Sequence, residues 1–331
     1  MVKGDIDFVL TWVDDKDPLW LEKKCQYTDS SQIEGNTNVR YRDWDTLRYW
    51  FRGVEKFAPW VHRIYFVTDN QVPEWLNLDH PKLKWVNHED FIPEEYLPTF
   101  NSHTIEWNLH RIEDLSEQFV YFNDDVFLIR DVSPEDFFVD GLPCDHPGLD
   151  YGTPHELWSY IPFNNTVLIN RHFHFKDSFR KNPWKWIKHQ SALELIKLFY
   201  FGKNRFISGV NAQHIHFSYR KEMFDLLWEE EYDLIHNTCK HRVRTKDDIS
   251  HWCVRDWQLM LGRFYPQKKM GRMFATRQVP DKKGPIAFIK KQKSKVICIN
   301  DTEQEDKFEE HKQIICATFE ALLPQKSRFE R

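Results

Sequence analysis

Three adjacent polar residues, Asn123, Asp124 and Asp125, interrupt an apolar run in the segment FVYFNDDVFL (residues 119–128). A solvated turn is one interpretation, because Asn and Asp side chains readily bond to nearby backbone groups. The other is a buried strand that delivers two carboxylates to a reaction centre, and the large apolar residues that resume at 126–128 favour it. Carboxylates placed in this way can accept a proton or hold a hard divalent cation.

Two other apolar segments, 6–13 (IDFVLTWV) and 64–67 (IYFV), also lead into polar residues. In an open α/β sheet, ligands bind beyond the carboxyl ends of the strands. If the three strands are neighbours, we expect one crevice lined by Thr11, Trp12, Asp14, Thr68, Asp69, Asn123, Asp124 and Asp125. Crowded carboxylates repel one another unless a cation sits among them, and an oxygen lining of this kind suits Mg²⁺ or Mn²⁺.

Two arginines one helical turn apart, Arg48 and Arg52, follow the first of these strands. A hard divalent cation usually brings a phosphate or diphosphate, and either guanidinium can bind phosphate oxygens bidentately. The sequence contains neither GxGxxG nor GxxxxGK[ST], which argues against a nicotinamide-binding site and against a P-loop NTPase.

A second group of candidate residues occupies VNAQHIHFSYR (residues 210–220). His214 and His216 alternate with apolar residues, so in a strand both imidazoles would lie on one face, with Arg220 soon after. A histidine that titrates near neutrality can act as a general base for a hydroxyl or stabilise charge on a transferred group. A hydrogen-bonded structural pair is the alternative. Further along, Arg244 belongs either to a solvated loop or to a phosphate clamp.

Alternating strand and helix patterns must position these groups. Apolar residues at helical spacing predict helices over 43–60, capped by Asp43 or Asp45, and over 101–118, capped by Ser102. Such alternation indicates an α/β domain whose mostly parallel sheet is covered by helices on both faces. The less regular middle of the chain predicts an irregular helical insertion. Further elements are expected as strands at 62–70, 82–90 and 296–299, and as helices at 190–201, 222–232, 255–264 and up to about 323.

The composition is that of a globular protein, with 41% hydrophobic and 29% charged residues. A net charge of -5 gives no overall basic footprint for nucleic acid. The 14 tryptophans fill a core or bind glycans. The chain shows no signal-peptide pattern and no run of 18 apolar residues, so we expect a cytoplasmic protein.

The six cysteines form no CxxC pair, which predicts free thiols. Cys239 with His241, and His251 with Cys253, are two doublets of potential metal ligands. Structural zinc doublets usually leave two to four residues between the ligands and these leave one, so ordinary packing is favoured over zinc.

The segment Lys268–Lys295 holds ten Lys or Arg residues and one acid, Asp281. A solvated, partly mobile basic loop is one interpretation. The other is a surface for anionic lipid or a lipid-diphosphate acceptor.

The chain resembles the Stealth family in the order of its characteristic regions, which here read DIDFVLTWVD, LRYWFRGVEKFAPWVHRIYFVTDNQVPEWL, FNSHTIEWNLHRIEDLSEQFVYFNDDVFL, VNAQHIHFSYR and HRVRTKDD. That family includes bacterial capsule and exopolysaccharide sugar-1-phosphate transferases and the animal enzyme that adds GlcNAc-1-phosphate to lysosomal glycoproteins. The resemblance runs from Asp5 to about Phe264, and the C-terminal strand and helix look like the ending of bacterial members. The expected fold is α/β, with a mostly parallel Rossmann-like or GT-A-like sheet.

The resemblance implies transfer of a hexose-1-phosphate, such as GlcNAc-1-phosphate, GalNAc-1-phosphate or Gal-1-phosphate, from a UDP-sugar to an acceptor hydroxyl. A phosphodiester forms and UMP leaves. It implies nucleotide-sugar binding by Thr11, Trp12, Asp14, Arg48, Arg220 and Arg244, and the expected crevice adds Asp69 and Asn123 to this set. It implies catalysis by Asp124, Asp125 and His216, with Asp124 and Asp125 also as ligands of Mg²⁺ or Mn²⁺. His216, rather than His214, falls at the position of the family's histidine.

The expected mechanism is in-line attack on the β-phosphorus, with Asp125 or His216 taking the proton while a metal ion and arginines spread the charge. The nearest alternative is a metal-dependent glycosyltransferase that releases UDP. A non-catalytic glycan-binding protein with a Trp-rich surface is the other alternative.

Three segments share these tasks in the expected organisation. Residues 1–140 bind the nucleotide sugar, residues 141–295 complete the catalytic and acceptor region, and residues 296–331 pack back on them. The expected partners are a UDP-sugar donor and a lipid-linked or polysaccharide glycan acceptor, with peripheral contact at the inner face of the plasma membrane through Lys268–Lys295. The expected destination is a bacterial cell-surface polysaccharide.

Overall fold

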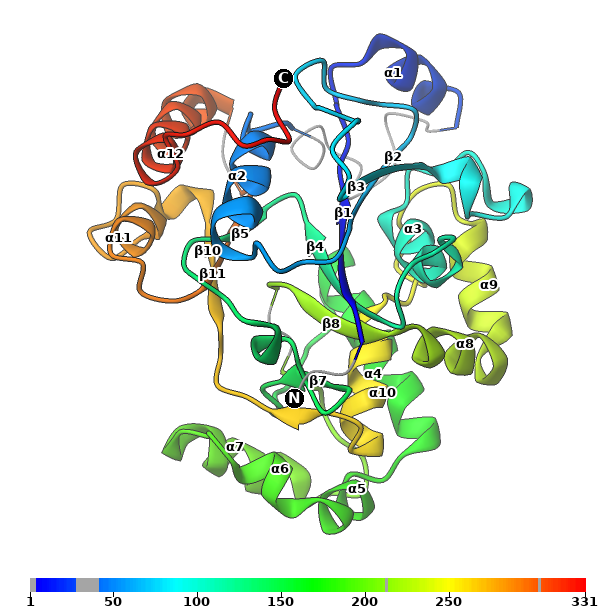
Figure 1. Ribbon diagram of the computed structural model, residues 1–331. Coiled ribbons are helices and arrows are strands. Elements are labelled where there is room, and N and C mark those ends of the chain that lie inside the picture. Colours follow the sequence, from blue (N-terminus) through cyan, green and yellow to red (C-terminus); the bar gives the residue numbers. More distant parts are fainter. Residues whose placement is uncertain (1–3, 28–41, 212–213, 303–304) are drawn as a thin grey trace.

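The computed structural model describes residues 4–27, 42–211, 214–302 and 305–331 (Figure 1). Its centre is a five-stranded sheet in the order β3-β2-β1-β4-β8, in which β8 runs antiparallel to β4 and the other strands are parallel. This confirms the mostly parallel sheet, and the three strands that lead into polar residues are indeed neighbours. The strands are β1 (Ile6–Thr11), β2 (Ile64–Thr68), β3 (Leu83–Asn87), β4 (Gln118–Asn123) and β8 (Phe217–Arg220).

A second sheet, in the order β10-β11-β5, continues directly from the first. Asp124 and Asp125 form a turn after β4, and β5 then pairs antiparallel with β11. The turn therefore joins the two sheets. The strands of this sheet are β5 (Val126–Leu128), β10 (Gly271–Ala275) and β11 (Val296–Asn300); a third small sheet contains β6 (Phe138–Val139), β7 (Leu142–Asp145) and β9 (Tyr265–Pro266).

Helices cover both faces of the central sheet, as the sequence predicts (Figure 1). Alternate residues of β1 point to opposite cores: Phe8 and Leu10 pack into one, and Val9 packs into the other. The first core lies under α2 (Leu47–Phe57), α11 (Pro285–Lys290) and α12 (Phe308–Leu322). The second lies under α3 (Ser102–Asn108), α4 (Leu157–His172), α8 (Lys221–Glu230), α9 (Tyr232–Lys240) and α10 (Trp252–Leu261).

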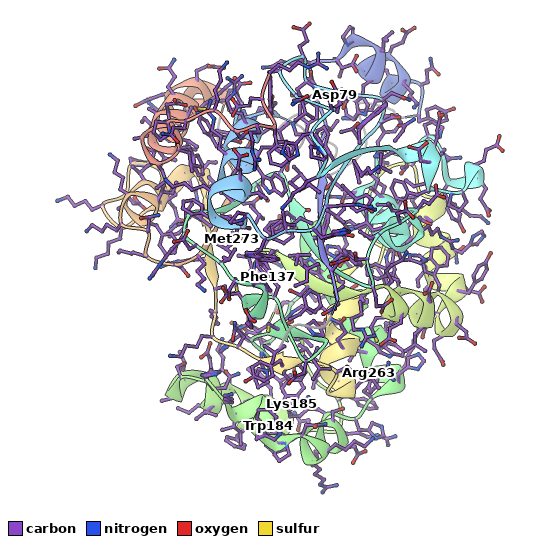
Figure 2. The ribbon with its side chains drawn as sticks, in the orientation of Figure 1. Asp79, Phe137, Trp184, Lys185, Arg263 and Met273 are labelled. Carbon is purple, nitrogen blue, oxygen red and sulfur yellow. The ribbon has the colours of Figure 1, made fainter. Side chains whose placement is uncertain are left out.

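Three short helices, α5 (Phe175–Lys181), α6 (Pro183–Ile187) and α7 (Ala192–Gly202), form the irregular insertion at the lower edge of Figure 1. Figure 2 shows Trp184 and Lys185 of α6 at this edge. Gly202 lets α7 approach α5 closely, because a Cβ there would lie 2.4 Å from the ring of Phe175. The outer side of α7 is unusually apolar, with Leu193, Ile196, Phe199 and Tyr200 57–66% exposed.

The predicted starts of two helices were wrong by one to a few residues. Helix α2 has Thr46 as its N-cap, not Asp43 or Asp45, and the left-handed φ of 54° at Asp45 keeps that residue out of the helix. The N-cap of α3 is Asn101, whose side chain accepts a hydrogen bond from the His103 amide. Helix α3 and the 3₁₀ turn after it end at Arg111, so the prediction to 118 was too long.

The basic segment Lys268–Lys295 is more structured than a loop, because it contains β10 and α11. Its first lysines lie against the insertion, where the Lys269 ammonium is 2.6 Å from the Glu194 carboxylate of α7. Among the described residues, no helix has both the length and the apolar composition needed to span a bilayer.

Candidate functional site

The carboxyl ends of the parallel strands meet at one pocket. Thr11 pairs in register with Val67 of β2 and with Asn123 of β4, so the ends of the three strands lie side by side. Helix α1 (Pro18–Cys25) closes the pocket from above, since Trp20 packs edge-on against Phe100 at 5.6 Å. We call this the sheet-edge pocket; it is lined by Thr11, Trp12, Val13, Trp20, Asp69, His88, Thr99, Phe100, Ser102, Ile105, Glu106, Tyr121, Asn123, Asp124, Asp125, His214, Arg244 and Asn300.

Asp125 has side-chain partners from two distant parts of the chain. Its carboxylate lies 3.6 Å from Nε2 of His214 and accepts a hydrogen bond of 3.3 Å from Sγ of Cys298. Asn123 completes the group through a 3.1 Å hydrogen bond between its side-chain amide and His214. Burial alone would raise the pKa of Asp125, but the charge of His214 and the hydrogen bond from Cys298 lower it. The carboxylate therefore stays ionised beside the histidine.

The pKa of Asp124 is shifted in the opposite direction to that of Asp125, although both residues belong to the same turn. Protein atoms crowd around its carboxylate while it remains open to the solvent of the pocket. This desolvation, with repulsion from Asp125 and from Asp43, raises the pKa of Asp124 to about 7. Two adjacent carboxylates with pKa values pushed apart are a common arrangement for dividing proton transfer from charge stabilisation.

One group in the described part of the chain has the geometry of a metal site. Ligand atoms of Asp125, His214 and Cys298 all lie within 4.8 Å of one another. The Oδ1 atom of Asp125 is buried and has no hydrogen-bond partner among the described residues, which suits a cation ligand. Burial raises the pKa of the Cys298 thiol well above its usual range, so the carboxylate and imidazole are the ready donors. An oxygen and nitrogen donor set suits Mn²⁺ or another transition metal better than Mg²⁺.

Beneath the pocket lies a buried polar network that the sequence did not reveal. The Thr11 hydroxyl is 2.9 Å from the Tyr121 hydroxyl, which donates to the Glu106 carboxylate at 3.3 Å. Burial would raise the pKa of Glu106, but His251 and His103 lower it to about 2. The fully satisfied carboxylate fixes the floor of the pocket. An acid four residues after a helix start resembles an ordinary surface residue in sequence, so no pattern marked Glu106.

Several residues predicted to bind the nucleotide sugar do line the sheet-edge pocket. Trp12 stacks on Phe66, with ring centroids 5.8 Å apart, and presents an aromatic surface. Asp69 is held by the Lys23 ammonium at 3.0 Å, and the Arg244 guanidinium donates to the Ser102 hydroxyl.

Other predicted residues lie outside this pocket. Arg48 lies over the ring of Trp75, and Asp14 bonds through its backbone amide to the side chain of Gln71; neither lines the pocket. Arg220 pairs in register with Gln118 at the start of β4, so it lies at the opposite end of the sheet. The antiparallel direction of β8 thus places Arg220, for which the resemblance implies nucleotide-sugar binding, away from the sheet-edge pocket.

Arg52, the alternative diphosphate ligand, is buried in the body of the protein. Its guanidinium donates to Glu330 at 2.7 and 2.9 Å, to Glu320 at 2.9 Å and to the Leu323 carbonyl at 2.9 Å. Four of its five N–H donors are thus used to fasten the C-terminal segment to α2.

His216 does not share a face with His214. Strand β8 begins only at Phe217, so the two-residue spacing does not have the geometry of a strand. The ring of His216 packs 5.1 Å from Phe137 and faces a separate pocket that also includes Asp145 and Arg255. Burial lowers the pKa of His216 to about 4. The structure thus brings His214, not His216, to the two aspartates.

A second pocket adjoins the first and shares Trp12, Asp124, Asp125 and Asn300 with it. We call it the Trp44 pocket and the two together the cleft. Trp44 donates its indole N–H to Asp301 at 3.0 Å, and the Arg42 guanidinium binds the same carboxylate bidentately at 3.0 Å. Apolar residues from α2, α12 and the second sheet form the rest of its wall: Leu47, Phe127, Ile299 and Ile315.

The two cysteine–histidine doublets do not form a metal site in the described part of the chain. Cys239 is buried beside Asn108, and His241 bonds to Asp248. His251 packs instead against Tyr219, whose hydroxyl lies 2.8 Å from the His251 ring. The packing interpretation of these residues is consistent with each contact.

Three family models match the chain: Stealth protein conserved region 1 over residues 4–32, conserved region 2 over 40–144 and conserved region 4 over 287–331. The capsular polysaccharide phosphotransferase WcwK of Streptococcus pneumoniae is 41% identical over 98% of this chain and 98% of its own length. The exopolysaccharide phosphotransferase cps2G of Lactiplantibacillus plantarum is 38% identical, with 99% and 96% covered. The receptor polysaccharide phosphotransferase WefC of Streptococcus gordonii is 39% identical, with 98% of each chain covered.

Solved structures are less similar. The galactosyltransferase LgtC, in complex with donor and acceptor sugar analogues, has a TM-score of 0.37 and 11% identity over 97% of this chain and 98% of its own. Mouse xyloside xylosyltransferase 1, in its apo form, has a TM-score of 0.35 and 12% identity over 91% and 98%.

Proposed function

The chain belongs to the Stealth family and is a transferase, and from this premise we propose that it moves a hexose-1-phosphate from a UDP-sugar to a hydroxyl of a glycan acceptor. The acceptor oxygen forms a bond to the β-phosphorus, the bond from that phosphorus to the bridging oxygen breaks, and UMP leaves. The hydroxyl proton passes to a base of the enzyme. The product is a phosphodiester in a bacterial cell-surface polysaccharide.

The observation that carries this proposal is the position of Asp124 and Asp125 at the junction of two pockets. A transfer between two substrates needs a centre that both can reach, and here an aspartate pair is reachable from two sides. The pKa of Asp124, raised to about 7 by desolvation and by Asp125, suits a general base at neutral pH. We assign the base to Asp124, although the sequence had favoured Asp125 or His216.

The sheet-edge pocket is the proposed donor site. Its aromatic residues Trp12, Trp20 and Phe100 suit a uracil ring, and Arg244 suits the diphosphate. Asn123 and Asp69 supply hydrogen-bonding groups for the ribose or the sugar. Arg48 and Asp14, which do not line this pocket, have no role in the proposal, and neither has Arg220.

A divalent cation fits the residues Asp125 and His214, with Asp124 close by. When bound there, it would neutralise charge on the transferred phosphate. The chain's own contribution is to keep Asp125 ionised through His214 and to orient both side chains through Asn123 and Cys298.

A membrane contact is part of the proposal, because a lipid-linked acceptor would be presented at the inner face of the plasma membrane. The exposed side of α7 and Trp184 (50% exposed) provide apolar and aromatic groups. The segment 173–206 holds eight Lys or Arg residues and two acids, and Lys268 and Lys269 adjoin it. Apolar and aromatic residues within a basic surface are typical of helices that lie on anionic lipid. We therefore place this contact on α6 and α7 together with the start of Lys268–Lys295.

A panel assay tests the proposal. The protein is incubated with UDP-glucose, UDP-galactose, UDP-GlcNAc or UDP-GalNAc, Mn²⁺ or Mg²⁺, and octyl glycosides as neutral acceptors, and the released nucleotide is identified by chromatography. UMP supports phosphotransfer. UDP supports the alternative glycosyltransferase, and glycan binding without nucleotide release supports the non-catalytic alternative.

A further inference from the structure

The cleft has two arms that differ in charge and share one reaction centre. We propose that the Trp44 pocket binds the acceptor glycan as an uncharged sugar, with the ring of Trp44 against the sugar face and Asp301 and Asp43 against its hydroxyls. The proposal rests on the proposed function, which requires two substrates to meet at Asp124 and Asp125.

The charges that line the Trp44 pocket favour a neutral occupant. The Trp44 pocket is lined by four carboxylates, those of Asp43, Asp124, Asp125 and Asp301, and by one cation, Arg42. Arg42 is engaged bidentately by Asp301, so its charge is already compensated. A nucleoside diphosphate would meet net negative charge in this pocket. A neutral sugar would not be repelled by this charge, and its hydroxyls are good donors to carboxylates.

The contacts of Trp44 hold its ring in a fixed position. Its indole N–H is fixed by Asp301, and its ring packs edge-on against Phe308, with centroids 4.8 Å apart. The backbone carbonyl of Trp44 also accepts a hydrogen bond from Sγ of Cys316. A partly exposed indole held in place from three sides provides a rigid flat apolar surface at little conformational cost. Such a surface suits the C–H face of a pyranose.

The other arm of the cleft has a different balance of charges. The sheet-edge pocket is also lined by four carboxylates, those of Asp69, Glu106, Asp124 and Asp125, but it holds two cationic groups, Arg244 and His214, and its Asp69 is paired with Lys23. It is therefore the less negative arm of the cleft and the one that suits an anionic donor. If the donor occupies that arm, the attacking hydroxyl must reach Asp124 from the remaining side, which is the Trp44 pocket.

Binding measurements on Trp44→Ala and Trp44→Phe test this assignment. Octyl glycosides of glucose, galactose, GlcNAc and GalNAc serve as sugar probes and UMP as the donor-side probe, with saturation-transfer NMR as the readout. We expect Trp44→Ala to weaken sugar binding by about 10-fold or more, whereas Trp44→Phe retains most of it. UMP affinity should stay within about twofold, since Trp44 does not line the sheet-edge pocket.

Trp85→Ala is the matched control, because Trp85 is an exposed tryptophan on β3, outside both pockets. It should leave both affinities unchanged. Retained sugar binding in Trp44→Ala, loss of UMP binding in its place, or no sugar binding by the wild type would each overturn the assignment. Should Trp44→Ala not fold, Asp301→Asn takes its place with the same expectation. Release of UDP instead of UMP by the wild type would refute phosphotransfer without altering this binding result.

Discussion

Asp125 and His214 lie 3.6 Å apart, although 88 residues separate the turn after β4 from the segment before β8. Burial works against the charged form of each, yet the pKa of Asp125 is lowered and that of His214 is raised, because each stabilises the charge of the other. This pair is the fixed part of the site, and Asp124 beside it is the part with a pKa near neutrality.

The two histidines are expected to differ in their effect on turnover. His214→Ala should lower turnover by about 100-fold or more, because it removes the partner of Asp125 and a donor of the candidate metal site. His216→Ala should reduce turnover per folded molecule by less than about 10-fold, since His216 faces a separate pocket. Steady-state rates of nucleotide release measure both. A severe loss of turnover in His216→Ala but not in His214→Ala would instead assign the catalytic role to His216, as the family resemblance implied.

Metal removal should abolish transfer. After treatment with EDTA and desalting, we expect activity to return with Mn²⁺ more fully than with Mg²⁺, because an imidazole belongs to the donor set. Metal titrations followed by nucleotide release measure this preference. Full activity in EDTA would rule out a required cation.

Replacing Arg52 should cost stability and not catalysis. Arg52→Met leaves the buried Glu330 without its partner, and breaking such a pair destabilises by about 3–5 kcal/mol. Glu320→Gln removes the half-exposed partner and should cost less than about 1 kcal/mol. Denaturant unfolding measures both. A stable Arg52→Met protein that had lost donor affinity would support the diphosphate role instead.

His110 should make the fold sensitive to acid. It is buried against Phe224, and burial together with Arg111 and Lys221 lowers its pKa to about 3. The unfolded chain binds a proton at this residue below about pH 6.5 and the folded chain does not, so the free energy of unfolding falls as the pH drops below that value. Between pH 7 and pH 5, the free energy of unfolding of the His110→Phe variant should fall by up to about 2 kcal/mol less than that of the wild type. Equal losses in both proteins would contradict this assignment.

The outer side of α7 should bind anionic membranes. Ile196→Glu with Phe199→Glu should lower cosedimentation with vesicles of phosphatidylglycerol and phosphatidylcholine, because the two exposed apolar residues then carry negative charge. The matched control is Leu19→Glu, an exposed apolar residue on α1, which should bind like the wild type. Unchanged cosedimentation of the double variant would exclude this surface as the membrane contact. If the wild type forms a dimer that the double substitution dissociates, the surface is instead a contact between copies of the chain.

The local parts of the fold were predictable from the sequence, because they depend on neighbouring residues. Apolar runs ending in polar residues identified β1, β2 and β4, and the sheet rule placed their ends at one pocket. The two interpretations of Asn123, Asp124 and Asp125 are both right in part: the residues form a turn, and the turn carries the acids of the site.

Contacts between distant segments were not predictable. No residue near Arg52 in the sequence indicates its ion pair with Glu330, which lies 278 residues away. The buried arginine of this structural ion pair was therefore interpreted as a candidate phosphate ligand. Cys298 reaches Asp125 only because β11 pairs with β5, a three-residue strand too short to recognise. The orientation of His214 and His216 depended on whether the strand begins before or after them, and sequence patterns locate such boundaries poorly.

The most direct test of phosphotransfer follows the β-phosphate of the donor. A UDP-sugar labelled with ³²P at the β-phosphorus is incubated with the protein, the activating metal ion and the acceptor that supports turnover, and the products are separated. The account predicts label in the acceptor, as a phosphodiester, with unlabelled UMP released. Label recovered in free UDP, with an unlabelled glycosylated acceptor, would contradict it.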